Sequence, residues 1–137
     1  MKTEYTAVAA AHGGRAGHVH SSDGILDLDL KRPVEMGGPG GGTNPEQLFA
    51  AGYSACFESA FRAIGAKQMK HLRDVVMTAR VSFNTDDAGS HFLSVEMHGA
   101  ADGLSKEETM ELMNAAHQIC PYSKATRGNI EVKLFAD

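Results

Sequence analysis

The sequence lacks the features that mark several large classes of protein. It has only two cysteines among 137 residues, too few for the disulfide framework of a small secreted domain. No apolar run approaches the roughly 18 residues of a membrane span, and the first residues, which include Glu4, show no signal-peptide pattern. We therefore expect a soluble, cytoplasmic protein that does not act in a membrane.

Positive charge is also scarce. The chain has 13 Lys and Arg against 17 Asp and Glu, a formal charge of −4, and its longest basic run is the dipeptide Lys31–Arg32. A surface that follows nucleic-acid phosphates needs clustered basic residues, so nucleic acid is not an expected partner. The hydrophobic fraction of 42% and the charged fraction of 22% are typical of a globular protein, and we expect a single domain over residues 1–137.

Turn signals and hydrophobic periodicity predict an α+β fold in the order βββ-α-ββ-α-β. Strands are expected over residues 2–10, 15–22, 25–30, 75–85, 91–99 and 130–135, all paired antiparallel. The first helix should begin at Pro45, capped by Thr43 or Asn44, and stop at Gly65. Its apolar residues lie on several faces, which indicates a central, buried helix.

The second predicted helix covers residues 106–119. Ser105 and Glu108 form a capping box at its start, and Pro121 ends it directly after Cys120. Between the third strand and the first helix lies a glycine-rich loop over residues 33–43. This loop matches neither the P-loop nor the dinucleotide fingerprint, because the flanking elements of both motifs are missing.

The two cysteines, Cys56 and Cys120, are the first candidates for chemistry. A reactive cysteine must be a thiolate near neutral pH, and a cation or a helix N-terminus is what lowers its pKa. Cys56 lies too far into its helix for the dipole to act, so a cation must come from elsewhere. Arg15, in a turn of small residues, and Arg127 are the candidates, while a buried cysteine acting as a small hydrophobe is the alternative.

Metal binding is a competing chemistry. The pair His117 and Cys120 has ligand spacing on a helix, and His18 and His20 fall on one face of a strand. Neither pair is a complete site. No serine lies in a nucleophile-elbow sequence, so a serine hydrolase is disfavoured.

Two long motifs give a more specific indication. Residues 44–57 read NPEQLFAAGYSACF, and residues 120–129 read CPYSKATRGN. Together they resemble the organic hydroperoxide resistance (Ohr) branch of the Ohr/OsmC family, over essentially the whole chain. The glycine-rich loop around residues 36–43 departs from the family pattern but contains none of the motif residues.

The resemblance implies an OsmC-like fold, with antiparallel sheets packed on two central helices in an intertwined homodimer. It also implies four site residues. Cys56 matches the peroxidatic cysteine, Cys120 the resolving cysteine, and Arg15 and Glu46 the polar pair that activates the thiolate. The implied activity is a peroxidase for alkyl or fatty-acid hydroperoxides, which protects against oxidative stress.

In the implied cycle a Cys56 sulfenic acid condenses with Cys120 to a disulfide. The resemblance implies no bound cofactor; dihydrolipoamide or a lipoylated protein is the expected reductant. Glu46 and Cys56 are ten residues apart, roughly 15 Å along a continuous helix. Either the helix breaks near Gly52 or the glutamate of one subunit serves the cysteine of the other.

The apolar residues near the motifs have two interpretations, a substrate pocket or ordinary core. They are Phe49, Phe57, Met110, Met113 and Tyr122. Two alternatives to the Ohr peroxidase remain open at this point. One is a binding module that holds a hydrophobic ligand without turnover, and the other is a peroxidase of the osmotically inducible branch.

Overall fold

The computed structural model describes all residues, 1–137, and they form two compact units, residues 1–48 and residues 49–137. Helix α1 (Pro45–Lys67) begins in the first unit and continues into the second. None of the helices combines the length and the apolar character needed to cross a membrane.

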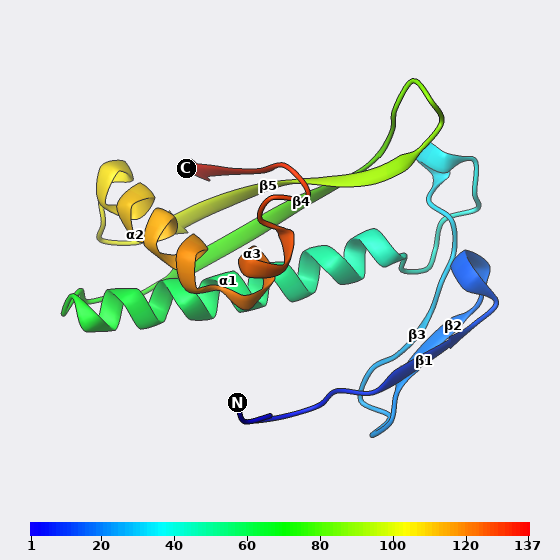
Figure 1. Cartoon of the computed structure of the whole chain (residues 1–137), viewed down its shortest axis with the longest axis horizontal. Helices are drawn as coiled ribbons and strands as arrows, with labels where there is room; N and C mark the ends of the chain where they lie inside the picture. Colours follow the sequence, from blue (N-terminus) through cyan, green and yellow to red (C-terminus); the bar gives the residue numbers. More distant parts are fainter. The chain divides into compact units, whose positions relative to one another are not determined.

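The first unit contains a small antiparallel sheet in the order β1 (Ala9–His12), β2 (His18–Ser21), β3 (Asp27–Asp29), drawn in blue shades in Figure 1. The predicted strand over residues 2–10 is wrong in its bounds. The strand lies at Ala9–His12 because its partner β2 has only four residues. Pairing between the two strands ends where the Ser22 N–H donates to the Val8 carbonyl, at 2.8 Å.

A tight turn, not an extended segment, joins β1 to β2. The 3-10 turn Gly14–Ala16 occupies the start of the predicted strand over residues 15–22. Gly13 has a φ of 79°, and a Cβ on Gly17 would lie 1.8 Å from the His12 carbonyl oxygen. Glycine is therefore required on both sides of the turn that presents Arg15.

Helix α1 starts as predicted and ends later. Of the two predicted caps, Asn44 is the one that acts, since its Oδ1 accepts from the Gln47 N–H at 2.8 Å. The predicted stop at Gly65 is wrong: the helix runs to Lys67, and Gly65 is buried against Leu72, where a Cβ would lie 2.6 Å from a leucine methyl carbon. The helix is also unbroken at Gly52.

The second unit contains the other sheet, in the order β4 (Val75–Thr85), β5 (His91–Ala101), β6 (Val132–Ala136). Strands β4 and β5 form a long antiparallel hairpin, as predicted. Strand β6 lies parallel to β5, which corrects the purely antiparallel expectation. Two helices connect β5 to β6 and return the chain to the same end of the sheet, as a parallel pair requires.

Helices α1 and α2 (Lys106–Ile119) share one core with the inner face of the β4–β5 hairpin (Figure 1). The capping box is confirmed: the Ser105 side chain accepts from the Glu108 N–H, and the Glu108 side chain accepts from the Ser105 N–H. The largest fully buried apolar side chains of this core are Tyr53, Phe57, Phe61, Met97, Leu112, Met113 and Cys120.

A third helix, α3 (Pro121–Thr126), was not predicted. Pro121 ends α2 as expected, but proline is also suited to the first position of a new helix, and here it begins one. Cys120 is therefore both the C-cap of α2 and the N-cap of α3, fully buried between two helices.

Candidate active site

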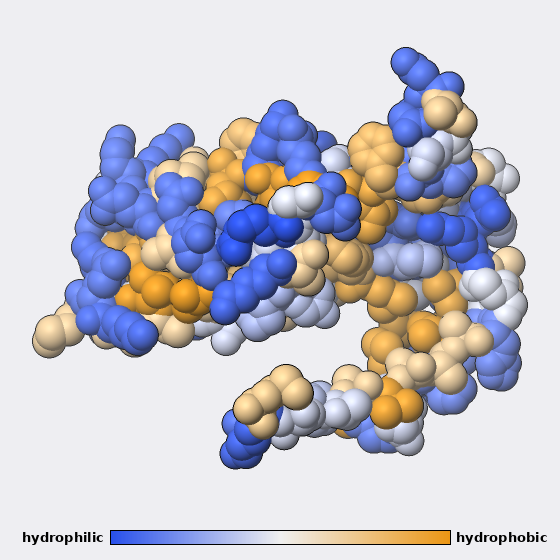
Figure 2. All heavy atoms as spheres, in the orientation of Figure 1, coloured by the Kyte–Doolittle hydropathy of each residue, from blue (hydrophilic) through white to orange (hydrophobic).

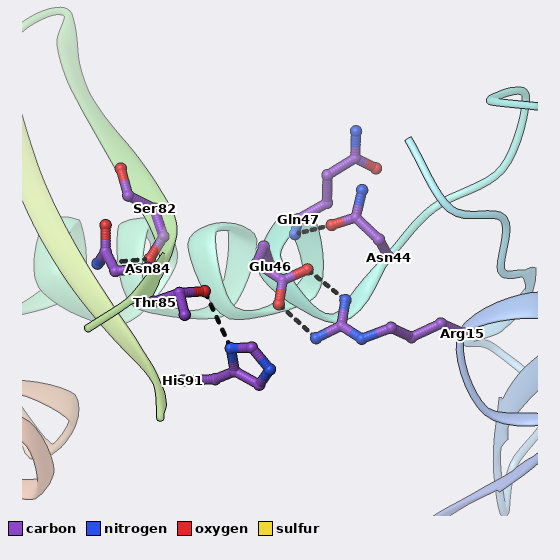
Figure 3. A network of polar contacts seen from close by, with 8 residues as sticks. All are labelled: Arg15, Asn44, Glu46, Gln47, Ser82, Asn84, Thr85 and His91. Atoms are coloured by element: carbon purple, nitrogen blue, oxygen red, sulfur yellow. Dashed lines mark hydrogen bonds and ion pairs between the residues drawn. The ribbon is translucent and has the colours of Figure 1, made fainter. Parts of the chain in front are cut away.

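The first part of the candidate site is an ion pair between Arg15 and Glu46 (Figure 3). Arg15 donates from Nη1 to Glu46 Oε2 at 2.8 Å and from Nη2 to Oε1 at 2.7 Å, so the pair is bidentate. The hydrogen bond from Arg15 lowers the pKa of Glu46, and the same bond raises the pKa of Arg15. The pair is therefore ionised throughout the neutral range and holds the guanidinium plane in one orientation.

The second part is a pair of free thiols. Cys56 projects from α1, and Cys120 joins α2 to α3. Their sulfur atoms lie 3.5 Å apart, with the Cys120 thiol donating towards Cys56. Cys56 is half-buried and Cys120 has no exposed surface. A disulfide needs about 2.05 Å between sulfurs, so the two sulfur atoms have only about 1.5 Å to close.

Burial is the main influence on the Cys56 thiol, and it raises the pKa. The backbone N–H of Tyr122 acts against burial by donating to the sulfur, while Cys120 raises the pKa further. Within the second unit no cationic side chain shifts this pKa. An ionised Cys56 at neutral pH therefore requires a cation in addition to the Tyr122 amide.

A groove of about 680 Å³ lies in the second unit, and neither cysteine is among its lining residues. Pro121 and Tyr122, which follow Cys120 directly, contribute to its wall. The Tyr122 ring lies against α1 because Gly52 has no side chain: a Cβ there would lie 2.7 Å from the Tyr122 hydroxyl. The other lining residues are Phe49, His91, Phe92, Leu93, Ala125, Thr126, Asn129 and Ile130.

Only part of the expected pocket lining is found in the groove. Phe49 and Tyr122 line it, whereas Phe57 and Met113 are fully buried core residues and Met110 packs against that core. The residues that the sequence did not indicate come from the start of β5 and from the segment that follows α3. No local pattern could have signalled them, because the parallel placement of β6 brings these two segments together.

In both residue pairs considered as metal ligands, a histidine is bonded to another partner. His117 bonds through Nδ1 to Ser123 Oγ at 2.7 Å, and both ring nitrogens of His18 bond to carboxylates, of Asp29 and Asp27. No group of three or more His, Cys, Asp or Glu side chains in residues 1–137 is arranged to hold a metal ion.

The four residues singled out in the sequence thus form two pairs, each within one unit. Arg15 and Glu46 meet in the first unit, and Cys56 and Cys120 meet in the second. Helix α1 connects the pairs, because it carries both Glu46 and Cys56. Arg127, the other candidate cation, instead donates to the His117 carbonyl and braces the end of α3 against α2.

Comparison with known proteins assigns the family. Residues 38–135 match the family described as OsmC-like protein. The organic hydroperoxide resistance protein of Xanthomonas axonopodis pv. citri is 49% identical over 135 residues, covering 97% of this chain and 94% of the relative. The chain belongs to the OsmC-like family. Its similarity to these relatives places it in the Ohr branch.

Solved structures of this family have the same fold. An organic hydroperoxide resistance protein from Legionella pneumophila superposes with a TM-score of 0.93 at 51% identity, over 99% of both chains. OhrB of Bacillus subtilis gives a TM-score of 0.89 at 44% identity, over 98% of this chain and 100% of the OhrB chain. The α+β, OsmC-like fold expected from the sequence is confirmed.

Proposed function

We propose that this OsmC-like protein is a thiol peroxidase that reduces organic hydroperoxides to alcohols and so protects the cell against oxidative stress. The observation that carries the proposal is the pair of free thiols 3.5 Å apart, one accessible and one buried. The organic hydroperoxide resistance proteins to which the chain is similar support the substrate class.

The first step uses Cys56. Its thiolate attacks the distal oxygen of R–O–O–H, the O–O bond breaks, and the alkoxide leaves as R–OH after taking a proton. Cys56 is oxidised to a sulfenic acid. Cys56 is suited to this step because it is the thiol with exposed surface.

The second step uses Cys120. Its sulfur attacks the sulfenic acid sulfur, a disulfide forms, and the hydroxyl leaves as water with the Cys120 proton. The short sulfur separation favours this closure over further oxidation of Cys56. A dithiol then reduces the disulfide to two thiols and becomes a disulfide itself.

We assign the missing positive charge at Cys56 to Arg15, held by Glu46. The bidentate pair keeps the guanidinium rigid, so that it can stabilise the thiolate and donate to the departing alkoxide oxygen. This role rests on the family resemblance and on the need for a cation, since burial raises the pKa of Cys56.

The apolar groove, whose wall includes Pro121 and Tyr122 directly after Cys120 in the sequence, supports an organic substrate over hydrogen peroxide. Phe49, Tyr122 and Ile130 among its lining residues offer an apolar surface to an alkyl or aryl group. Dihydrolipoamide, free or on a lipoylated protein, is the proposed reductant. A related organic hydroperoxide resistance protein of Vibrio cholerae, 42% identical with a TM-score of 0.92, has been solved with captopril bound in one of its active sites.

We also propose a homodimer. Figure 2 shows apolar residues at the surface along α1, where Ala51, Ala55 and Ala63 are exposed, and Val76 on the neighbouring strand is 60% exposed. A second copy would cover these residues. Because the cycle needs a supply of reduced dithiol, we place it in the cytoplasm.

The groove also favours a second candidate, a binding module that holds a hydrophobic ligand without turnover. A thiol titration separates the two functions. One equivalent of cumene hydroperoxide per chain should remove both free thiols, and dihydrolipoamide should restore them and sustain turnover. If both thiols survive the hydroperoxide, the peroxidase proposal is wrong and the binding module is favoured.

A further inference from the structure

A buried network of hydrogen bonds lies next to the two cysteines and takes no part in the proposed chemistry. It joins one residue of α1, one of α2 and two of α3, and we name it the hydroxyl network. Its members are Tyr53, His117, Ser123 and Thr126. Tyr53 and Ser123 have no exposed surface, and Thr126 is 5% exposed.

The hydrogen count of the network assigns every donor. Thr126 Oγ1 donates to the Ser123 carbonyl at 3.1 Å, so its hydrogen is used. The Tyr53 hydroxyl lies 3.2 Å from Thr126 Oγ1 and 2.9 Å from Ser123 Oγ. Because Thr126 has no second hydrogen, Tyr53 is the donor in its bond to Thr126, and Tyr53 can then only accept from Ser123. The serine hydrogen then points at Tyr53, and His117 Nδ1 must donate to Ser123 Oγ.

In this assignment each hydroxyl accepts one hydrogen bond and donates one. The bonds run in one direction, from His117 to Ser123, then to Tyr53, and then to Thr126. Burial, with a smaller contribution from Arg127, lowers the pKa of His117, which favours a neutral ring near neutral pH. A neutral ring has one N–H, and the network requires it on Nδ1. No buried side-chain polar atom of the hydroxyl network lacks a hydrogen-bond partner.

The network grips α3, an element that needs support. A helix of six residues is too short to be stable alone. Ser123 and Thr126 are three residues apart and share one helix face, and the Tyr53 hydroxyl bonds to both of them. His117 holds Ser123 from the side of α2.

The residue next to Ser123 is Tyr122, whose backbone N–H is close enough to Cys56 to lower the pKa of that thiol. On its other side lies Cys120, through Pro121. The α3 helix has no side-chain cap at Cys120. The orientation of the Tyr122 amide and the position of the Cys120 sulfur therefore depend on how α3 is anchored.

We propose that the hydroxyl network is a positioning device that holds the first turn of α3 so that the Tyr122 amide and the Cys120 sulfur both meet Cys56. Tyr53, Ser123 and His117 are its positioning residues. The effect of this network on catalysis rests on the proposed peroxidase function. Its effect on the Cys56 thiolate can be tested without peroxide.

The first test measures alkylation of Cys56 by iodoacetamide as a function of pH, in a Cys120→Ala background. Alanine is used because a serine at this N-cap would itself support α3. We expect Tyr53→Phe to move the midpoint of the alkylation profile to higher pH. At neutral pH the rate should fall about three- to tenfold, since the hydrogen bond to a charged sulfur is weakened.

A substitution pair at His117 separates positioning from mere stability. His117→Asn can still donate to Ser123 and should keep the profile of the parent. His117→Leu cannot donate and should shift the profile as Tyr53→Phe does. His117 is only half-buried, so these variants should fold even if Tyr53→Phe does not.

The matched control is Thr109→Val. Thr109 is 1% exposed on the same helix α2, and its hydroxyl donates to the Ser105 carbonyl at the opposite end from Cys120. This variant should lower thermal stability and leave the alkylation profile unchanged. The inference is wrong if Tyr53→Phe and His117→Leu lower stability as Thr109→Val does but keep the parent profile.

The second test uses the chain with both cysteines and follows disulfide formation after one equivalent of cumene hydroperoxide. Closure should slow several-fold in Tyr53→Phe and His117→Leu and keep its normal rate in His117→Asn. If the unsubstituted chain does not react with the hydroperoxide, the proposed function fails, while the alkylation test still decides the positioning inference. Equal closure rates in all variants would contradict it.

Discussion

Among single residues, the two cysteines differ chiefly in exposure, and their roles should differ accordingly. Cys56→Ser should abolish peroxide turnover, because a serine hydroxyl has no accessible anion near neutral pH. A dihydrolipoamide-driven assay measures this, and residual activity above about a tenth would contradict the assignment of Cys56.

Cys120→Ala gives the opposite pattern. The variant should reduce one equivalent of hydroperoxide and then stop as a Cys56 sulfenic acid, exposed to further oxidation because the buried partner 3.5 Å away is gone. Intact mass spectrometry should show an oxygen adduct after one equivalent. A mass spectrum without an adduct would mean that Cys120 is needed before resolution as well.

The Arg15–Glu46 pair leads to a prediction about the thiolate. Arg15→Ala should raise the pKa of Cys56 and slow its oxidation at least about tenfold, because a positive charge near a thiolate favours the ionised form. The pair is partly exposed, with side chains 27% and 14% accessible, so the fold should be retained.

Arg15→Lys is the matched variant, since it keeps the charge and loses the bidentate geometry. We expect an intermediate oxidation rate. Stopped-flow oxidation and a thiolate absorbance titration measure both effects, with circular dichroism as the check on folding. An unchanged titration in Arg15→Ala would show that another group supplies the charge.

At the scale of secondary-structure elements, the capping box of α2 is a local signal with a local cost. Ser105→Ala should lower the free energy of unfolding by about 1 kcal/mol, because the Glu108 N–H loses its acceptor. Ser105→Asp should restore most of the loss. Urea denaturation of both variants measures the difference, and equal stability of the alanine and aspartate variants would show that the cap contributes nothing.

The pairing of β2 with β3 should depend on pH. His18 bonds to Asp29 through Nδ1 and to Asp27 through Nε2. Both hydrogen bonds raise the pKa of His18, and the bond to Asp29 has the larger effect. The stabilisation is complete below the ordinary imidazole pKa of about 6.5 and is lost as pH rises through the raised folded value.

Hydrogen exchange over residues 18–29, corrected for intrinsic rates, should therefore show less protection at about pH 9 than at about pH 6. His18→Gln should remove this difference. His20→Gln changes the other histidine of the strand and should keep it. A pH difference that persists in His18→Gln would assign the effect to another group.

At the scale of the whole molecule, the unbroken α1 determines how Glu46 can serve a cysteine. Glu46 and Cys56 are ten positions apart on this helix, roughly 15 Å along the axis, beyond the reach of a glutamate side chain. Because the helix does not break at Gly52, we propose that Arg15 and Glu46 of one subunit complete the site of the other.

Mixed dimers test this arrangement. In a dimer of one Glu46→Ala chain and one Cys56→Ser chain, the surviving Cys56 receives an intact Glu46 from its partner, and one site should react at nearly the normal rate. Each parent homodimer should be slow. Slow mixed dimers, with dimer formation verified by size analysis, would place glutamate and cysteine in the same chain.

The sequence by itself determined the features that depend on local chemistry. Asn44, Pro45, Ser105 and the alternating residues of β4 satisfy or bury groups within a few residues of themselves, so their patterns predict helix starts and strands directly. The motifs around Cys56 and Cys120 likewise indicate the family from the sequence alone.

Only the tertiary structure decided the features that depend on partners distant in sequence. Gly65 resembles a helix stop but is a packing position against Leu72, and Pro121 both ends one helix and starts another. The bond from Tyr53 to Ser123 spans 70 residues. Such contacts follow from how helices and strands pack, and packing is set by the whole core, not by local pattern.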